Sequence, residues 1–120
     1  MVVVDDDDGV REAIADVLAL DGYEVMTARD GGEALRVLDA APRPCVALVD
    51  LVMPRIDGWE LLRTIRATPS LRDIPVLCTT AGRDDLPPGC YALLRKPFDD
   101  RELSAAIRSA FSAARPRPTA

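Results

Sequence analysis

Three segments of this chain place a chemically active side chain at the end of a short apolar run, and a fourth places a lysine after Leu93-Leu94-Arg95. Apolar runs of this length are typical of buried strands. The carboxyl ends of parallel strands lie side by side in an open α/β sheet, so residues far apart in sequence meet there in a common crevice. The side chains concerned are, in chain order, Asp5 and Asp6, then Asp50, then Thr80, then Lys96, with Asp7 and Asp8 extending the first acidic run.

Carboxylates gathered in one crevice repel one another, by about 4 kcal/mol per pair at 4 Å and an effective dielectric constant near 20. A divalent cation removes this penalty. An all-oxygen site suits a hard ion such as Mg²⁺, which keeps waters that phosphate oxygens can displace. One oxygen of Asp50 could then attack a phosphoryl group in line while Lys96 neutralises charge on the phosphoryl oxygens. The pattern predicts a magnesium-dependent phosphorylation site whose product is an aspartyl phosphate.

Lys96 is the only lysine among the 15 basic residues. Its compact ammonium differs from the planar guanidinium of arginine and suits a site that needs a point charge beside one phosphate oxygen. The alternative is a solvated surface lysine with no role in the chemistry.

Helices are expected between the strands because apolar residues recur there at helical spacing. The alternation of strands and helices requires parallel crossover connections, which are right-handed and place helices on both faces of the sheet. We therefore predict an α/β fold with a doubly wound five-stranded parallel sheet. The predicted strands cover residues 2–4, 23–28, 46–49, 76–79 and about 91–95, and the predicted helices run to about residue 20, from 32 to about 40, through 59–65 to a stop near 68, and from a cap at Asp99 or Asp100 to about 112.

Length and composition indicate one domain over residues 1–112, followed by a Pro/Arg-containing tail at 113–120 that is either a terminus or the start of a linker. The net charge of −5 disfavours nucleic-acid and anionic membrane surfaces as partners. Cys45, Cys78 and Cys90 are odd in number and lack a Cys-x-x-Cys spacing, which favours buried free thiols in a reducing compartment. With no signal-peptide pattern and no apolar run of membrane length, a cytoplasmic location is expected.

Four motifs, in this order and at compatible intervals, make the chain resemble the receiver domain of two-component response regulators. The resemblance runs from residue 2 to about 111 and implies a flavodoxin-like sheet with strand order 2-1-3-4-5. The motifs are Val3-Val4-Asp5-Asp6, then Leu48-Val49-Asp50 with Met53-Pro54 and Asp57-Gly58 following, then Thr80-Ala81, and finally Lys96-Pro97-Phe98.

The resemblance also implies a role for each site residue. Asp6 and Asp50 would bind Mg²⁺ directly, Asp5 through a water molecule, and Val52 through its main-chain carbonyl. Asp50 would accept the phosphoryl group, with Lys96 aimed at it by a cis bond to the following proline. Thr80 would sense the phosphate through its hydroxyl, although a threonine at a strand end can also simply cap a backbone group. Asp7 and Asp8 are left out of the ligand set.

The segment between Thr80 and Lys96 departs from the family. It has 15 residues, whereas the family has about six more, which corresponds to over one and a half helical turns. Pro87 and Pro88 within it disfavour a helix, so the fourth helix is expected to be short or missing. The family commonly carries an aromatic residue three positions before the lysine, where this chain has Leu93.

The resemblance favours a cytoplasmic phosphoacceptor that is phosphorylated on Asp50 by a sensor histidine kinase or a phosphotransfer protein and signals to an unidentified partner protein. It would catalyse its own phosphorylation without being a turnover enzyme, and would be a monomer or weak dimer.

One alternative is a pseudo-receiver, a binding module with an eroded switch. A flavin carrier would need a Ser/Thr/Gly-rich loop after the first strand, and a phosphohydrolase would need a second acid after its nucleophile, where the chain has Leu51 and Val52. Because Val52 and Gly82 cannot orient a hydrolytic water, a long-lived aspartyl phosphate is expected.

Overall fold

The computed structural model of the protein describes residues 1–51, 58–82 and 87–114. Strands and helices alternate along the first part of the chain, and two strands follow one another before the last helix. The elements are β1 (Val2–Val4), α1 (Asp8–Leu20), β2 (Met26–Ala28), α2 (Gly31–Ala40), β3 (Ala47–Asp50), α3 (Gly58–Ala67), β4 (Val76–Thr80), β5 (Ala92–Arg95) and α4 (Asp100–Ala113).

All five strands form one parallel sheet in the order β2-β1-β3-β4-β5. This confirms the predicted fold class and strand order. The three central strands, β1, β3 and β4, are buried along their whole length, as expected where helices cover both faces of a parallel sheet. The register pairs Val4 of β1 with Val49 of β3, and Asp50 of β3 with Thr79 of β4. The carboxyl ends of these strands therefore meet at one edge.

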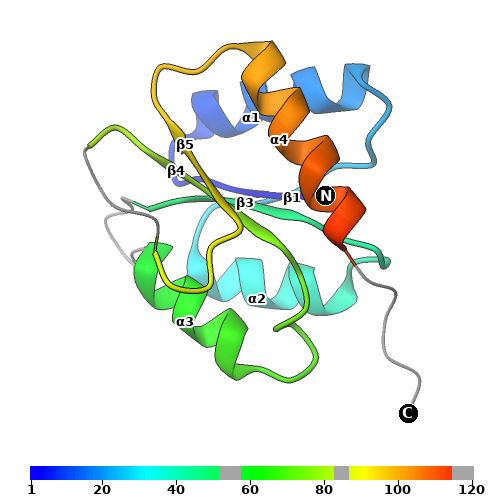
Figure 1. The fold of residues 1–120 in the computed structure, drawn as a ribbon, viewed down its shortest axis with the longest axis vertical. Helices are drawn as coiled ribbons and strands as arrows, with labels where there is room; N and C mark the ends of the chain where they lie inside the picture. The colour runs from blue at the N-terminus through cyan, green and yellow to red at the C-terminus, as the bar shows by residue number, and fades with distance from the viewer. Residues whose placement is uncertain (52–57, 83–86, 115–120) are drawn as a thin grey trace.

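Helices α1 and α4 cover one face of the sheet, and α2 and α3 cover the other (Figure 1). The side chains of β1 alternate between the two faces, so that Val3 packs with Leu18 and Ile107 while its neighbours on either side pack with α2 and α3. Two apolar layers result, one on each side of the sheet. None of the helices in the described part of the chain combines the length and apolar character that a membrane span requires.

In the part of the chain that the structure describes, three aspartates cap helices through their side chains. Asp7 accepts from the amide of the third residue of α1, Asp30 caps α2, and Asp99 caps α4 by accepting from Glu102 at 2.8 Å. The sequence had left Asp99 and Asp100 open as the cap, and the structure selects Asp99. After α1 the chain turns at Gly22, whose φ of 94° is a conformation that suits glycine.

Strand β2 is shorter than predicted, because residues 23–25 do not join the sheet. The Tyr23 amide donates to the carbonyl of Leu18 at 3.1 Å and so completes the end of α1. Its ring stacks on Phe111 of α4, with the ring centroids 5.3 Å apart. Tyr23 thus lies in the turn between α1 and β2 and contacts α4 there instead of starting the strand.

The described residues between β4 and β5, 81–82 and 87–91, form bends and turns and contain no helix. This agrees with the expected loss or shortening of the fourth helix. All three cysteines are buried free thiols, also as predicted.

Candidate functional site

The sheet register places three of the predicted site residues at one edge. Asp5 follows the last residue of β1, and its amide donates to the carbonyl of Ala28 in β2 at 3.1 Å. Asp50 is the last residue of β3, and Thr80 is the last residue of β4. The Lys96 amide donates to the carbonyl of Thr80 at 2.7 Å, so the residue after β5 joins the same edge.

The carboxylates of Asp5, Asp6 and Asp50 come together there. Each offers an oxygen, and these oxygens all lie within 4.8 Å of one another. Asp5 and Asp50 are buried, whereas Asp6 is exposed to solvent. Two of the carboxylates are thus largely shielded from water and the third opens the cluster to it.

Burial and crowding make this cluster costly for negative charge. Burial is the main cause that raises the pKa of Asp5, and the nearby carboxylates of Asp50 and Asp6 raise it further. The main-chain N–H of Asp7 donates to Asp5 at 2.9 Å and acts in the opposite direction, as does the charge of Lys96. A cation among the three carboxylates would relieve the remaining repulsion, and a donor set made only of oxygen fits Mg²⁺.

Lys96 points at Asp50. Its ammonium nitrogen lies 3.5 Å from one carboxylate oxygen of Asp50, and both side chains are mostly shielded from solvent. The bond between Lys96 and Pro97 is cis, as the resemblance implied. The one lysine of the chain therefore faces the carboxylate expected to act as nucleophile.

Thr80 is completely buried, and its hydroxyl oxygen accepts a hydrogen bond from the amide of Gly82 at 3.1 Å. This contact is the capping arrangement considered for a threonine at a strand end. It ties the start of the loop after β4 to the end of the strand.

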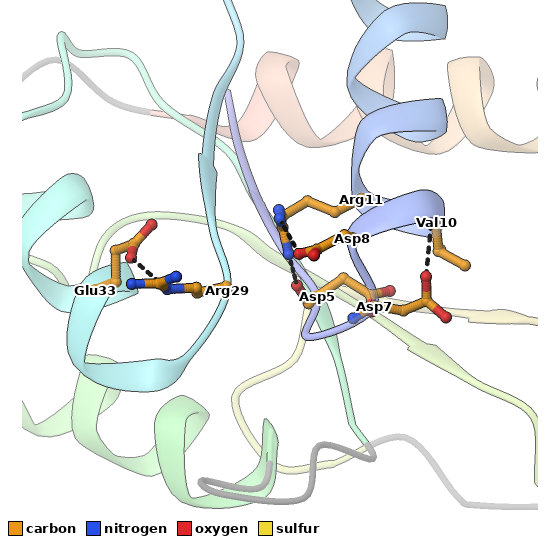
Figure 2. Close-up of polar contacts among 7 residues, drawn as sticks. All are labelled: Asp5, Asp7, Asp8, Val10, Arg11, Arg29 and Glu33. Atoms are coloured by element: carbon orange, nitrogen blue, oxygen red, sulfur yellow. Dashed lines mark hydrogen bonds and ion pairs between the residues drawn. The ribbon is translucent and has the colours of Figure 1, made fainter.

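Asp7 and Asp8, which were left out of the predicted ligand set, have structural partners. Asp7 caps α1 by accepting from Val10 at 3.0 Å. Asp8 forms an ion pair with Arg11, one helical turn later. Figure 2 shows both side chains directed toward these partners.

Arg11 was missed by the sequence analysis. Its side chain is largely buried and donates to the main-chain carbonyl of Asp5 at 2.9 Å (Figure 2). It thereby joins α1 to the loop that carries the acidic pair. The spacing of Asp8 and Arg11, three residues on a helix, was the available signal for the ion pair, but the contact with Asp5 depends on how the loop folds back.

Gly58 was quoted as part of a motif, and the structure gives it a packing reason. A Cβ atom at this position would lie 2.4 Å from the carbonyl oxygen of Asp50 and 2.6 Å from the Cα of Leu51. The Gly58 amide also donates to the Leu51 carbonyl at 3.1 Å. The start of α3 thus packs directly against the backbone of the proposed nucleophile.

Val52, the fourth predicted metal ligand, lies outside the described residues.

Comparison with known proteins gives a consistent picture. The family model described as "Response regulator receiver domain" matches residues 1–108. Response regulator MprA of Mycobacterium bovis (strain BCG / Pasteur 1173P2) is 39% identical over 127 residues, an alignment that covers 100% of this chain and 54% of the relative. Response regulator MprA of Mycolicibacterium vanbaalenii is 41% identical over 116 residues, with 91% and 48% covered. The chain spans about half the length of these curated relatives.

Solved structures agree. The signal receiver domain of a signal transduction histidine kinase from Syntrophus aciditrophicus superposes with a TM-score of 0.83 at 28% identity, covering 99% of this chain and 94% of that one. A chemotaxis protein of Vibrio cholerae superposes with a TM-score of 0.83 at 30% identity, covering 91% and 95%.

Proposed function

Because the chain belongs to the response regulator receiver domain family of two-component signalling, we propose that it is a phosphoacceptor in which Asp50 takes a phosphoryl group with Mg²⁺ bound to Asp5, Asp6 and Asp50. The observation that carries this proposal is the arrangement around Asp50, with two further carboxylates within 4.8 Å and the Lys96 ammonium at 3.5 Å. The predicted carbonyl of Val52 completes the proposed ligand set.

The proposed reaction is an in-line transfer to Asp50. A carboxylate oxygen of Asp50 forms a bond to phosphorus while the bond between phosphorus and the donor's leaving group breaks, and the donor keeps that electron pair. Bound Mg²⁺ would supply a positive charge that offsets the charge on the phosphoryl oxygens. Lys96 already faces the Asp50 carboxylate and is placed to pair with a phosphoryl oxygen after transfer. Two positively charged groups, Mg²⁺ and Lys96, would thus stabilise a phosphoryl group that adds negative charge to the carboxylate cluster.

Thr80 is the proposed sensor of the phosphate. Its hydroxyl holds the Gly82 amide at 3.1 Å. A phosphoryl oxygen on Asp50 that accepted a hydrogen bond from this hydroxyl would draw the loop after β4 toward the site. The proposed donor is a sensor histidine kinase or a phosphotransfer protein, and the signal would pass to a partner protein. The proposal concerns these 120 residues and includes no nucleic-acid contact or catalytic turnover by them.

Two observations favour a second candidate, a pseudo-receiver that binds partners without being switched by phosphate. The described residues between β4 and β5 contain no helix. In addition, Tyr91, the nearest aromatic residue to the usual switch position, bonds to Ser109 of α4 instead, with 2.7 Å between the two hydroxyl oxygens. Both features concern the output region and leave the chemistry around Asp50 intact.

A direct test is to incubate the protein with a small phosphodonor such as acetyl phosphate and Mg²⁺ and to measure its intact mass. We expect one added phosphate that survives acid, is lost in base, and does not appear when a chelator removes the metal. The Asp50→Asn variant should lose the adduct. Asp16→Asn, an exposed carboxylate on α1, is the matched control and should keep it.

An adduct that persists in Asp50→Asn would overturn the assignment of the nucleophile. Absence of any adduct in the folded wild-type protein, with Mg²⁺ present, would favour the pseudo-receiver.

A further inference from the structure

Asp6 is the carboxylate of the acidic cluster that no side-chain contact holds in place. It is exposed, and among the residues that the structure describes its side chain forms no hydrogen bond or ion pair. One of its oxygens nevertheless lies within 4.8 Å of oxygens of Asp5 and Asp50. The direction of this side chain is therefore set by the backbone on either side of it.

Both peptide groups that flank Asp6 are held by hydrogen bonds. On one side, the carbonyl oxygen of Asp5 accepts from the guanidinium of Arg11 at 2.9 Å. On the other side, the amide of Asp7 donates to the carboxylate of Asp5 at 2.9 Å. Because a peptide group is planar, a hydrogen bond to its oxygen or from its N–H limits the rotation of the whole group. The two contacts therefore restrict the backbone dihedral angles of Asp6, and with them the direction of its side chain.

The carbonyl of Asp5 lies beyond the end of the sheet pairing. Strand β1 pairs with β2 and β3 as far as Val4, and the amide of Asp5 still donates to the carbonyl of Ala28. Asp5 is only 3% exposed, and a buried main-chain carbonyl without a partner is costly. Arg11 supplies a donor at the point where the strand pairing has ended.

Arg11 is itself held from two directions. Its main-chain amide donates to the carbonyl of Asp7 at 2.9 Å, at the start of α1. One nitrogen of its guanidinium binds the carboxylate of Asp8, and the other binds the carbonyl of Asp5 (Figure 2). The Arg11 side chain is 12% exposed, whereas that of Asp8 is 78% exposed. Arginine suits this position because its planar group carries donors on separate nitrogens, whereas lysine has a single nitrogen.

The charge of Arg11 opposes the binding of a cation by the neighbouring carboxylates, because like charges repel. If Arg11 acted only through its charge, its removal would strengthen magnesium binding. If it acts by holding Asp6 in place, its removal would weaken magnesium binding. The two roles therefore predict opposite changes in affinity.

We propose that Arg11 is a positioning residue of the magnesium site. Through the carbonyl of Asp5 it fixes the orientation of Asp6 as a metal ligand, and Asp8 in turn orients Arg11. This rests on the proposed function, because it takes Mg²⁺ as the ion bound by Asp5, Asp6 and Asp50. It gives Asp8, an acid outside the ligand set, an indirect part in metal binding.

The test is isothermal titration calorimetry of the complete chain with MgCl₂ and no phosphodonor. Loss of a residue that orients a metal ligand typically weakens metal affinity by about 10- to 100-fold. Since Arg11 reaches Asp6 through one peptide group, we expect the lower end, a Kd about tenfold higher in Arg11→Met. Arg63→Met makes the same charge change at an exposed position of α3 and should not weaken Mg²⁺ binding.

A double variant tests whether Arg11 acts through Asp6. When Asp6→Asn is already present, adding Arg11→Met should cause no further rise in the Kd, because two changes that act through one group are not additive. A purely structural role of Arg11 would lower the Tm in chelator in both backgrounds and leave the Kd of the folded protein unchanged.

Arg11→Lys keeps the positive charge and decides the question if Arg11→Met does not fold, which circular dichroism in chelator checks. One ammonium group cannot keep both contacts in the same geometry. We therefore expect Arg11→Lys to bind Mg²⁺ more weakly than the wild-type protein and more tightly than Arg11→Met.

The outcomes separate this inference from the proposed function. A wild-type protein that binds no Mg²⁺ would overturn the proposed function and this inference with it. Magnesium binding by the wild-type protein with an equal or lower Kd in Arg11→Met, or in Arg11→Lys, would overturn this inference alone. So would a tenfold loss of affinity that persists when Asp6→Asn is present.

Discussion

Neutralising Asp6 should stabilise the protein when no metal is present and should weaken its response to magnesium. The Asp6 carboxylate is exposed but lies within 4.8 Å of those of Asp5 and Asp50. Asp5 and Asp6 are adjacent in the sequence and repel each other in the unfolded chain as well. The repulsion that folding adds is therefore mainly the one between Asp6 and Asp50. The variant Asp6→Asn removes this repulsion and also removes one of the proposed metal ligands.

The size of the effect follows from Coulomb's law. At the 4.8 Å limit, two unit charges repel by about 0.9 kcal/mol in bulk water and by about 3.5 kcal/mol at an effective dielectric constant near 20. Because Asp6 is exposed and Lys96 offsets part of the repulsion, we expect the lower part of this range, about 1 to 2 kcal/mol. For a domain of this size that corresponds to a rise in Tm of about 4 to 8 °C.

Thermal unfolding followed by circular dichroism at low salt measures this, with each protein scanned once in chelator and once in excess Mg²⁺. In the wild-type protein we expect Mg²⁺ to raise the Tm, because a ligand that binds only the folded state stabilises it. Asp6→Asn should have the higher Tm in chelator and should lose most of the rise with Mg²⁺. Asp16→Asn changes the net charge equally but lies outside the cluster, on α1. It should change neither the Tm in chelator nor the rise in Tm with Mg²⁺ by more than about 2 °C, which corresponds to about 0.5 kcal/mol.

A Tm for Asp6→Asn below that of the wild-type protein in chelator would refute the argument from crowded charges. An undiminished magnesium response in Asp6→Asn would remove this residue from the ligand set. Equal shifts in the Asp6 and Asp16 variants would show that net charge, not the cluster, is responsible.

Three further predictions concern single positions near the site. Gly58→Ala should lower the free energy of unfolding in urea by about 1 to 3 kcal/mol because its Cβ would overlap backbone, whereas Gly32→Ala, whose Cβ would meet only ordinary contacts, should be neutral or stabilising. Asp7→Ala should lower the free energy of unfolding in urea by about 1 kcal/mol because the helix cap is lost. The rise in Tm with Mg²⁺ should stay as in the wild-type protein, and its loss would make Asp7 a metal ligand. The aspartyl phosphate should be long-lived, since Val52 and Gly82 cannot orient water, and rapid loss of label from purified protein in Mg²⁺ would contradict this.

The fold could be predicted from the sequence because its central strands are short apolar runs, its helices repeat apolar residues at helical spacing, and its last helix begins at an aspartate cap. These signals act locally and survive packing unchanged. The prediction was wrong at the start of β2. There Tyr23 completes the end of α1 and stacks on Phe111, a contact between distant segments that no local pattern announces.

At the site, the sequence identified the residue types and the strand ends that carry them. It did not identify the contact of Arg11 with Asp5 or the close packing of Gly58 against Asp50. Each of these depends on the distance between two elements, which is set by sheet register and helix packing.

Residue identity and periodicity were sufficient to establish a doubly wound sheet with acids, a hydroxyl and a lysine at the ends of its strands. They were sufficient because hydrophobic periodicity, helix capping and turn chemistry depend on neighbours along the chain. Packing alone settled which of those groups face one another and which are shielded from water. Such relations depend on distances of a few ångströms between elements, and nothing in the order of residues specifies them directly.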